Sequence, residues 1–255
     1  MRTSIIKKII LTIIITAIWL AIWQGIYFLV DNPLFVESPK NVFLRLVELA
    51  GQGMFWQTVI YSVANILQGF FIGILFGVLM AFISINEFLD SFFAPVKVII
   101  RATPVASFIM LMWIWLERAY IPAFVSFLMV TPIIWGNVST GIKSVKKEHK
   151  ELAKVYNFSA LKKLKYIYFP TVLPYFATAV CTCSGLVWKA GIAAEVLCQP
   201  KGTIGANLFE AKGFLEYLDV FVWTVVVIII SLLLELAIKT ILKKLEKRFK
   251  IAGLM

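Results

Sequence analysis

Six long apolar stretches constrain the fold of this 255-residue chain more than any other feature. They cover residues 9–30, 57–84, 93–115, 119–140, 171–196 and 220–241. Each has the roughly 20 residues that a helix needs to cross the hydrocarbon core of a bilayer. Because hydrophobic residues make up 61% of the chain and charged residues only 15%, an ordinary soluble domain is excluded. The alternating pattern of a membrane β-barrel is absent, so the sequence predicts an all-α polytopic membrane protein with about six transmembrane helices.

The chain divides into four parts within a single membrane domain. They are an N-terminal transmembrane helix (1–32), an external amphipathic segment (33–56), a core of five helices (57–242) and a basic tail (243–255). We read the first apolar stretch as an uncleaved helix, because it is longer than a signal-peptide core and no small-residue cleavage site follows it. In the external segment, Ser38-Pro39 is expected to begin a helix that ends at Gly51.

The basic residues predict the orientation of the chain in the membrane. Most of the 25 lysines and arginines lie near the N-terminus, in the loop 141–170 and near the C-terminus. Since cytoplasmic loops carry an excess of these residues, both termini and this loop are expected in the cytoplasm. The net charge of +11 therefore indicates orientation and contact with membrane lipid, with no nucleic-acid partner. The three cysteines lack metal-ligand spacing, so no metal site is expected.

Glycines and prolines predict how the core helices pack and where they break. Gly69, Gly73 and Gly77 recur at four-residue spacing, which allows a neighbouring helix to approach closely. Four prolines are expected to interrupt the third and fourth apolar stretches, where the freed backbone groups must be buried in protein or face water. These prolines are Pro95, Pro104, Pro122 and Pro132.

The basic loop 141–170 has the pattern of two short helices joined by a kink. An apolar stripe is expected on a first helix between Ser144 and Tyr156, formed by Val145, Leu152, Val155 and Tyr156. Asn157 follows where the helix would stop, and Ser159 is a candidate N-cap for the second helix. Leu161, Leu164 and Tyr168 share one face of that second helix. Composition alone leaves two alternatives open, a loop that docks a partner through its apolar residues or a loop that lies on anionic lipid headgroups.

The spacing within this loop resembles the cytoplasmic "EAA" loop of ABC importer permeases, written E-A-A-x3-G-x9-I-x-L-P. In this chain the matching residues are Glu151-Leu152-Ala153, Asn157, Ile167 and Pro170. Leu152 stands for the second alanine, Asn157 for the glycine and Phe169 for the leucine, and a helix–kink–helix tolerates all three. The resemblance implies that a cytoplasmic ATPase grips this loop. The implied coupling residues are Glu151, Leu152, Ala153, Tyr156, Asn157, Phe158, Ile167 and Pro170.

From about residue 33 onward the chain resembles the permease subunits of nitrate/sulfonate/taurine-type ABC importers. The matching segments, in the family's order, are Ser38-Pro39-Lys40-Asn41-Val42, Ser62–Phe70, Arg101-Ala102-Thr103-Pro104, Pro170 with Pro174-Tyr175, Ala193-Ala194-Glu195 and Gly202-Thr203-Ile204-Gly205. Two departures lie near the expected pathway: Asn65 replaces a usual basic residue, and Ala102 replaces a usual proline. These departures weaken any transfer of a substrate from characterised relatives.

The resemblance implies a type I ABC importer permease fold in the bacterial cytoplasmic membrane. It further implies a second permease subunit in a homodimer, a separate ABC ATPase, and an extracellular or periplasmic substrate-binding protein. The chain itself would be non-catalytic and without cofactor, since ATP is used by the partner. The cargo would be a small anionic or aromatic nutrient, such as a sulfonate, nitrate, taurine or a vitamin precursor.

Charges inside apolar stretches are candidates for the transport pathway, because each is costly in a membrane. Arg101, Lys189 and Glu195 are such charges, and we group Pro104 and Trp188 with them. An ion pair between Glu195 and Lys189 or Arg101 that fixes helix packing is the alternative.

Two other classes of protein have less support in the sequence than an ABC permease. An ion-coupled secondary transporter would need symmetry between the two halves of the chain, and none is found. A membrane enzyme has less support, because the one histidine, His149, lies among lysines with no carboxylate pair or Cys/His cluster.

Overall fold

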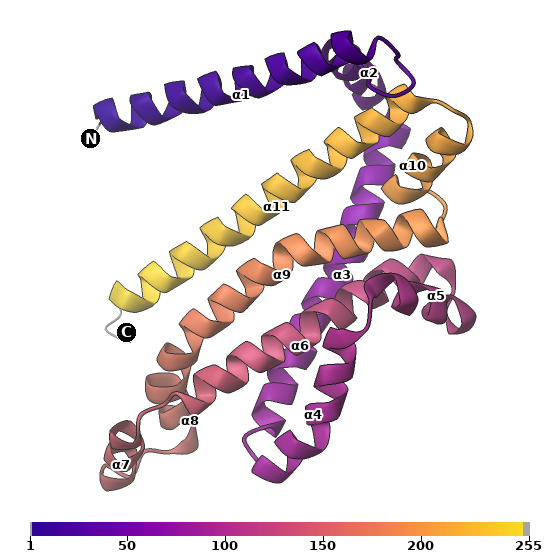
Figure 1. Cartoon of the computed structure of the whole chain (residues 1–255). Helices are drawn as coiled ribbons and strands as arrows, with labels where there is room; N and C mark the ends of the chain where they lie inside the picture. The colour runs from indigo at the N-terminus through magenta and orange to yellow at the C-terminus, as the bar shows by residue number, and fades with distance from the viewer. Residues whose placement is uncertain (1, 252–255) are drawn as a thin grey trace.

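The computed structural model describes residues 2–251, and every regular element among these residues is a helix (Figure 1). The helices are α1 (Arg2–Val30), α2 (Pro39–Ala50), α3 (Gly53–Ile83), α4 (Glu87–Ala102), α5 (Val105–Trp115), α6 (Ile121–Lys143), α7 (Lys147–Val155), α8 (Ala160–Lys163), α9 (Phe169–Cys198), α10 (Ile204–Gly213) and α11 (Tyr217–Ile251). A 3₁₀ turn, η1 (Arg118–Tyr120), precedes α6, and a π-helical turn, η2 (Leu164–Tyr168), leads into α9. The all-α prediction is confirmed; residues 252–255 of the expected basic tail lie outside the described residues.

Five stretches of helix are long and apolar enough to cross a membrane, and a bent pair of helices supplies a sixth candidate. The five are Ile10–Val30, Gly53–Ile83, Arg118–Lys143, Ala160–Cys198 and Tyr217–Lys244. The bent pair is α4 and α5, which meet at an angle of 105°. The expected number of spans is therefore confirmed, but residues 93–115 do not form a straight span.

Pro104 explains the bend between α4 and α5. Proline disfavours helical backbone in the residue before it, and Thr103 is extended, with φ −76° and ψ 128°. The prediction that the other three prolines interrupt helices is wrong. Pro95 and Pro132 lie inside α4 and α6, and Pro122 lies in the first turn of α6, where its missing N–H costs little. Neighbouring helices re-satisfy backbone groups that such prolines free inside a membrane bundle.

The glycine row predicted on the second apolar stretch lies where α3 packs against α6. A Cβ on Gly69 would come within 1.9 Å of the Ala123 carbonyl oxygen, and one on Gly77 within 2.8 Å of the Thr131 carbonyl oxygen. A Cβ on Gly73 would likewise meet Val130 at 2.8 Å. The predicted close approach is thus confirmed, and α9 packs against α6 as well.

The external amphipathic segment contains the expected helix, α2. The Ser38 hydroxyl accepts a hydrogen bond from the Asn41 N–H at 3.1 Å, and Gly51 caps the other end. Arg45 on α2 forms a bidentate pair with Asp219 at the start of α11, with N–O distances of 2.8 and 3.0 Å. Hydrogen bonds to Asp219 and then Glu48 raise the pKa of Arg45, so this link keeps its charge.

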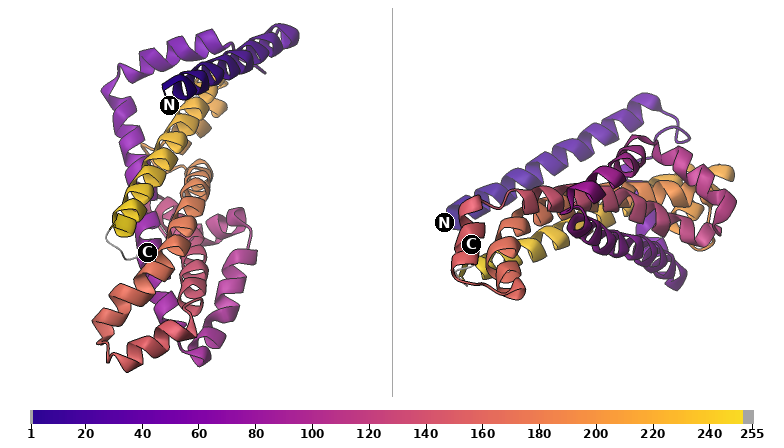
Figure 2. Two further views of the ribbon diagram at one scale, coloured as in Figure 1. Left: turned by 90° about the vertical axis from the view of Figure 1, so that its left-hand side faces the viewer. Right: turned by 90° about the horizontal axis from the view of Figure 1, so that it is seen from below.

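The basic segments of the chain lie together at one end of the helix bundle. The start of α1, the end of α11 and the α7–α8 loop lie on the left in Figure 1, whereas α5 and α10 lie on the right. The view from below in Figure 2 shows the same separation. This arrangement is the one expected if the three segments share one side of the membrane, and their cytoplasmic location stays a prediction.

Candidate functional site

The loop 141–170 forms the predicted helix–kink–helix. Asn157 has a left-handed backbone, with φ of 47°, directly after the end of α7. The Asn157 N–H donates to the Lys154 carbonyl at 3.1 Å and the Phe158 N–H to the Ala153 carbonyl at 2.9 Å, which together make a Schellman cap. The Ser159 hydroxyl accepts from the Lys162 N–H at 3.4 Å and so begins α8. Local sequence signals therefore place the kink correctly.

Three buried residues fasten the loop to the bundle. Val145, Ala153 and Ile167 form a small apolar cluster, against which Phe158 and Tyr168 pack. Val145 was expected on the exposed stripe of the first helix, but α7 begins only at Lys147, so Val145 lies in the preceding turn and points into the cluster. We call these three residues the buried anchor.

Four large apolar side chains remain exposed around the kink, and we call them the coupling patch. They are Leu152, Val155, Tyr156 and Leu161. Val155 and Leu161 are each 78% exposed, and Tyr156 is 69% exposed. Glu151 is also exposed beside them, and Pro170 lies in the first turn of α9. Large exposed apolar side chains gathered in one loop among charged residues are typical of a protein interaction site, and the buried anchor fastens this loop to the bundle.

The kink provides a direct test of the loop geometry. Replacing Asn157 with valine is expected to cost about 1–2 kcal/mol, because a β-branched residue is strained in the left-handed region. Asn157→Gly is the matched control and is expected to be neutral. Trypsin cleavage within the lysine-rich loop of the purified protein measures the effect, with roughly five- to thirtyfold faster cleavage expected for the valine variant. Equal cleavage of the two variants would contradict the assigned kink.

The three exposed pathway candidates lie on α4, α5 and α9. Arg101, in the last turn of α4, donates from Nη2 to the Pro132 carbonyl of α6 at 2.8 Å, and its side chain covers Gly136. Pro104 precedes α5 at the 105° bend and is exposed. Lys189 is exposed on α9, between two buried neighbours. The structure therefore brings Arg101 and Pro104 to the two sides of one bend.

The other two pathway candidates, Trp188 and Glu195, are buried between helices of this chain. The Trp188 indole N–H donates to the Val227 carbonyl of α11 at 2.9 Å. Glu195 Oε2 accepts from the Ser62 hydroxyl and from the Gly205 N–H, both at 3.0 Å. Among the described residues no ion pair joins Glu195 to Lys189 or Arg101, so the structure does not contain the alternative pairing. The role of Ser62 was missed, although it lies within one of the matched segments.

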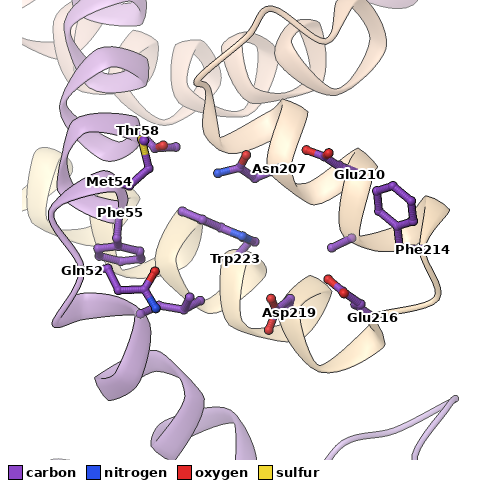
Figure 3. Close-up of a pocket in the computed structure, with 12 residues that line it drawn as sticks. Gln52, Met54, Phe55, Thr58, Asn207, Glu210, Phe214, Glu216, Asp219 and Trp223 are labelled. Atoms are coloured by element: carbon purple, nitrogen blue, oxygen red, sulfur yellow. The ribbon is translucent and has the colours of Figure 1, made fainter.

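A hollow of about 370 Å³ opens at the opposite end of the bundle, between the start of α3, α10 and the start of α11 (Figure 3). Three carboxylates line it, from Glu210, Glu216 and Asp219. The stacked rings of Phe55 and Trp223, with centroids 5.2 Å apart, form part of its wall. We call this feature the outer acidic hollow, because the topology expected from the basic residues places this end of the bundle outside the cell. The sequence alone does not reveal it, because it joins residues 49–58 to residues 207–223, and neither segment carries a motif.

The chain is similar to known transport permeases. The sequence profile of a family described as "Binding-protein-dependent transport system inner membrane component" matches residues 73–251. The bicarbonate transport system permease protein CmpB of Synechococcus elongatus is 25% identical over 187 residues, which cover 72% of this chain and 66% of CmpB. The nitrate import permease protein NrtB of Leptolyngbya laminosa is 25% identical, with the same 72% and 66% coverage. The chain thus spans slightly less than two thirds of the length of these relatives.

Two further similar proteins align over a larger share of this chain and of their own length. A probable ABC transporter permease protein of Haemophilus influenzae is 24% identical over 81% of this chain and 84% of its own length. A chain from the crystal structure of an amino acid ABC transporter with histidines superposes with a TM-score of 0.63 at 15% identity, over 81% of this chain and 98% of that chain. That likeness shows the shared fold. Because the family profile matches well over half of the sequence, this multi-pass membrane protein belongs to the inner-membrane permease components of binding-protein-dependent transport systems.

Proposed function

We propose that this chain is the permease subunit of an ATP-driven ABC importer and that the coupling patch is the surface gripped by its ATPase. The observation that carries the proposal is an exposed apolar patch, fastened by the buried anchor, at the basic end of a chain that belongs to a permease family. ATP binding would close the ATPase dimer and displace the patch. Hydrolysis, performed by the partner, would reset it. The permease itself would perform no chemistry and hold no cofactor.

The buried anchor explains how such a displacement would reach the transmembrane helices. Val145 lies two residues after the end of α6, and Ile167 lies in the turn that leads into α9. Because Ala153 of α7 belongs to the same apolar cluster, a push on α7 would move the ends of α6 and α9 together. Closely packed interiors shift between discrete arrangements instead of deforming gradually. The loop would thus act as a lever on two core helices.

The proposed cargo is a small anion, or an aromatic compound carrying an anionic group. Arg101 and Lys189 are exposed cations within the apolar part of the chain, and Arg101 lies beside the bend at Pro104. The named relatives that transport bicarbonate and nitrate support an anion. Trp188 and Glu195, being buried, would act on the pathway by fixing the helices around it.

The complete transporter would contain a second copy of this chain, two ATPase subunits and an external binding protein. With the patch and both termini in the cytoplasm, the outer acidic hollow would face the binding protein. Phe214 and Leu215 protrude next to the hollow, and Leu215 has the left-handed backbone, with φ of 61°, that bulky residues rarely adopt. Exposed apolar residues beside a charged recess fit the core and rim of a protein interface.

Charge reversal in the hollow tests this docking. In the double variant Glu210→Lys, Glu216→Lys, the concentration of binding protein that half-maximally stimulates ATP hydrolysis is expected to rise about tenfold or more, since like charges at an interface slow association and weaken it. The probe is the binding protein recovered with the complex from native membranes. Glu117→Lys, an exposed reversal beside η1, is the matched control. An equal rise in both variants would mean that the hollow is not the docking surface.

Uptake into proteoliposomes containing the purified complex separates the proposed function from an ion-coupled transporter. With binding protein outside and ATP inside, one of three labelled anions, bicarbonate, nitrate or an alkanesulfonate, is expected to accumulate and to stop accumulating with vanadate. Accumulation driven by a proton or sodium gradient in liposomes containing this chain alone would overturn the proposal. Failure of all three anions with ATP hydrolysis intact would exclude the anionic cargo and leave the ATPase coupling supported.

A further inference from the structure

The turn between α9 and α10 is short and held in an unusual backbone conformation. Gln199 and Gly202 both have left-handed backbones, with φ of 51° and 74°. Thr203 then caps α10, because its hydroxyl donates to the Pro200 carbonyl at 2.8 Å and accepts from the Ala206 N–H at 3.2 Å. The start of α10 is therefore placed against α9 by local contacts.

A buried polar network extends this placement to α3. Glu195 Oε2, on α9, accepts from the Gly205 N–H at 3.0 Å, and the Ser62 hydroxyl of α3 lies 3.0 Å from the same oxygen. The Ser62 oxygen in turn accepts from the Ile204 N–H at 2.9 Å. Ser62, Glu195 and Ile204 are fully buried. The consecutive helices α9 and α10 thus meet the distant helix α3 through one carboxylate and one hydroxyl.

The network satisfies the first two amides of α10, since the Ile204 N–H donates to the Ser62 hydroxyl and the Gly205 N–H to the Glu195 carboxyl group. The N–H groups in the first turn of a helix lack partners within the helix and carry partial positive charge, so a carboxylate there is stabilising. The contact also requires glycine at position 205, because a Cβ there would lie 2.3 Å from the Glu195 Cβ. The segments Ala193-Ala194-Glu195 and Gly202-Thr203-Ile204-Gly205, matched separately in the sequence, therefore form one structural unit.

We propose that Glu195 and Ser62 form a latch that positions α10 for docking of the external binding protein. Glu195 is then a positioning residue and not a ligand of the cargo. The geometry behind this is that Asn207, Glu210 and Ala211 of α10 form one wall of the outer acidic hollow (Figure 3). The start of the same helix is tied to α3 by the hydrogen bond from the Ile204 N–H to the Ser62 hydroxyl. The role in docking rests on the proposed function; the latch itself rests on the contacts alone.

The test compares four variants in the purified permease–ATPase complex. Glu195→Ala and Ser62→Ala remove the two members of the latch. Glu195→Gln keeps an oxygen that accepts both hydrogen bonds and removes the charge. Ser126→Ala is the matched control, because Ser126 is an equally buried serine whose hydroxyl donates only within α6, to the Pro122 carbonyl at 2.7 Å.

The first measurement is amide hydrogen exchange in peptides covering residues 203–208. Exchange is expected to be at least about tenfold faster in Glu195→Ala and Ser62→Ala, within about threefold of the wild type in Glu195→Gln, and unchanged in Ser126→Ala. Unchanged exchange in Glu195→Ala would overturn the latch.

The second measurement adds increasing concentrations of the native binding protein, recovered with the complex, and follows the rate of ATP hydrolysis. In Glu195→Ala the half-maximal concentration is expected to rise about tenfold while the rate at saturation falls less than about threefold, and Glu195→Gln is expected to restore most of the affinity. Faster exchange with unchanged affinity would overturn the positioning role. Absence of any ATPase partner for the wild type would overturn the proposed function, and the exchange data would still decide the latch.

Discussion

Replacing Gly69 with alanine is expected to lower the thermal unfolding midpoint of the detergent-purified protein by about 5 °C or more. The added methyl group would lie 1.9 Å from the Ala123 carbonyl oxygen and 2.7 Å from its carbon, both of them backbone atoms that no side-chain rotation can move. Overpacking of this kind typically costs about 1–3 kcal/mol, and here α3 must separate from α6 to relieve it. Differential scanning fluorimetry follows the transition, and size-exclusion chromatography reports any loss of folded protein.

Gly185→Ala is the control for this prediction. Gly185 also lies inside a transmembrane helix, but a Cβ there would have no neighbour within 4 Å. Alanine at that position is expected to be neutral or to stabilise the helix by roughly 0.5–1 kcal/mol. If Gly69→Ala and Gly185→Ala unfolded at the same temperature, the close contact between α3 and α6 would be wrong.

The double variant Leu152→Asp, Tyr156→Ala is expected to reduce ATPase recovery with the tagged permease at least about tenfold. Both side chains are exposed in the coupling patch, at 50% and 69%. Large apolar anchors at an interface are each commonly worth about 2 kcal/mol or more, and an aspartate at the contact adds desolvation. Neither residue belongs to the buried anchor, so the permease is expected to keep its wild-type unfolding midpoint. Quantitative mass spectrometry of affinity-purified complexes gives the ratio of ATPase to permease.

Leu34→Asp provides the matched control. Leu34 is 57% exposed, close to the exposure of Leu152, but it lies between α1 and α2 at the opposite end of the bundle. Its replacement is expected to leave the ATPase-to-permease ratio unchanged. Equal recovery of the ATPase with the wild type and the double variant would remove the coupling patch from the interface.

Features fixed by neighbouring residues were predictable from the sequence. The kink at Asn157, the cap at Ser159 and the start of α2 at Ser38 each depend on a hydrogen bond spanning a few residues, and all three lie where the sequence predicts them. The glycine row of α3 was also predictable, because glycines at four-residue spacing commonly mark the face on which a neighbouring membrane helix packs closely. The expected six spans follow from hydropathy alone.

Features that depend on several distant segments were not predictable. All four prolines were expected to interrupt helices, yet of these four only Pro104 lies at a break between helices. Packing against neighbouring helices decides whether the backbone groups that a proline leaves without a partner can form other hydrogen bonds. Glu195 had two possible explanations, a pathway residue or half of an ion pair. Its contacts with Ser62 and Gly205 take the place of the ion pair, and a role in the pathway stays a prediction. Val145 was placed on the wrong surface because the first helix of the loop was expected to begin two to three residues too early.

Site-specific photo-cross-linking from position 156 tests most directly whether an ATPase grips this permease. A photoreactive phenylalanine analogue replaces Tyr156 in the full-length protein in native cells, and the cross-linked partner is identified by mass spectrometry. The account predicts an adduct with a P-loop ATPase subunit from position 156, and none with that subunit from position 34 at the other end of the bundle. Adducts from position 156 with lipid alone, in membranes where this chain transports its cargo, would contradict the account and favour a loop that lies on the membrane surface.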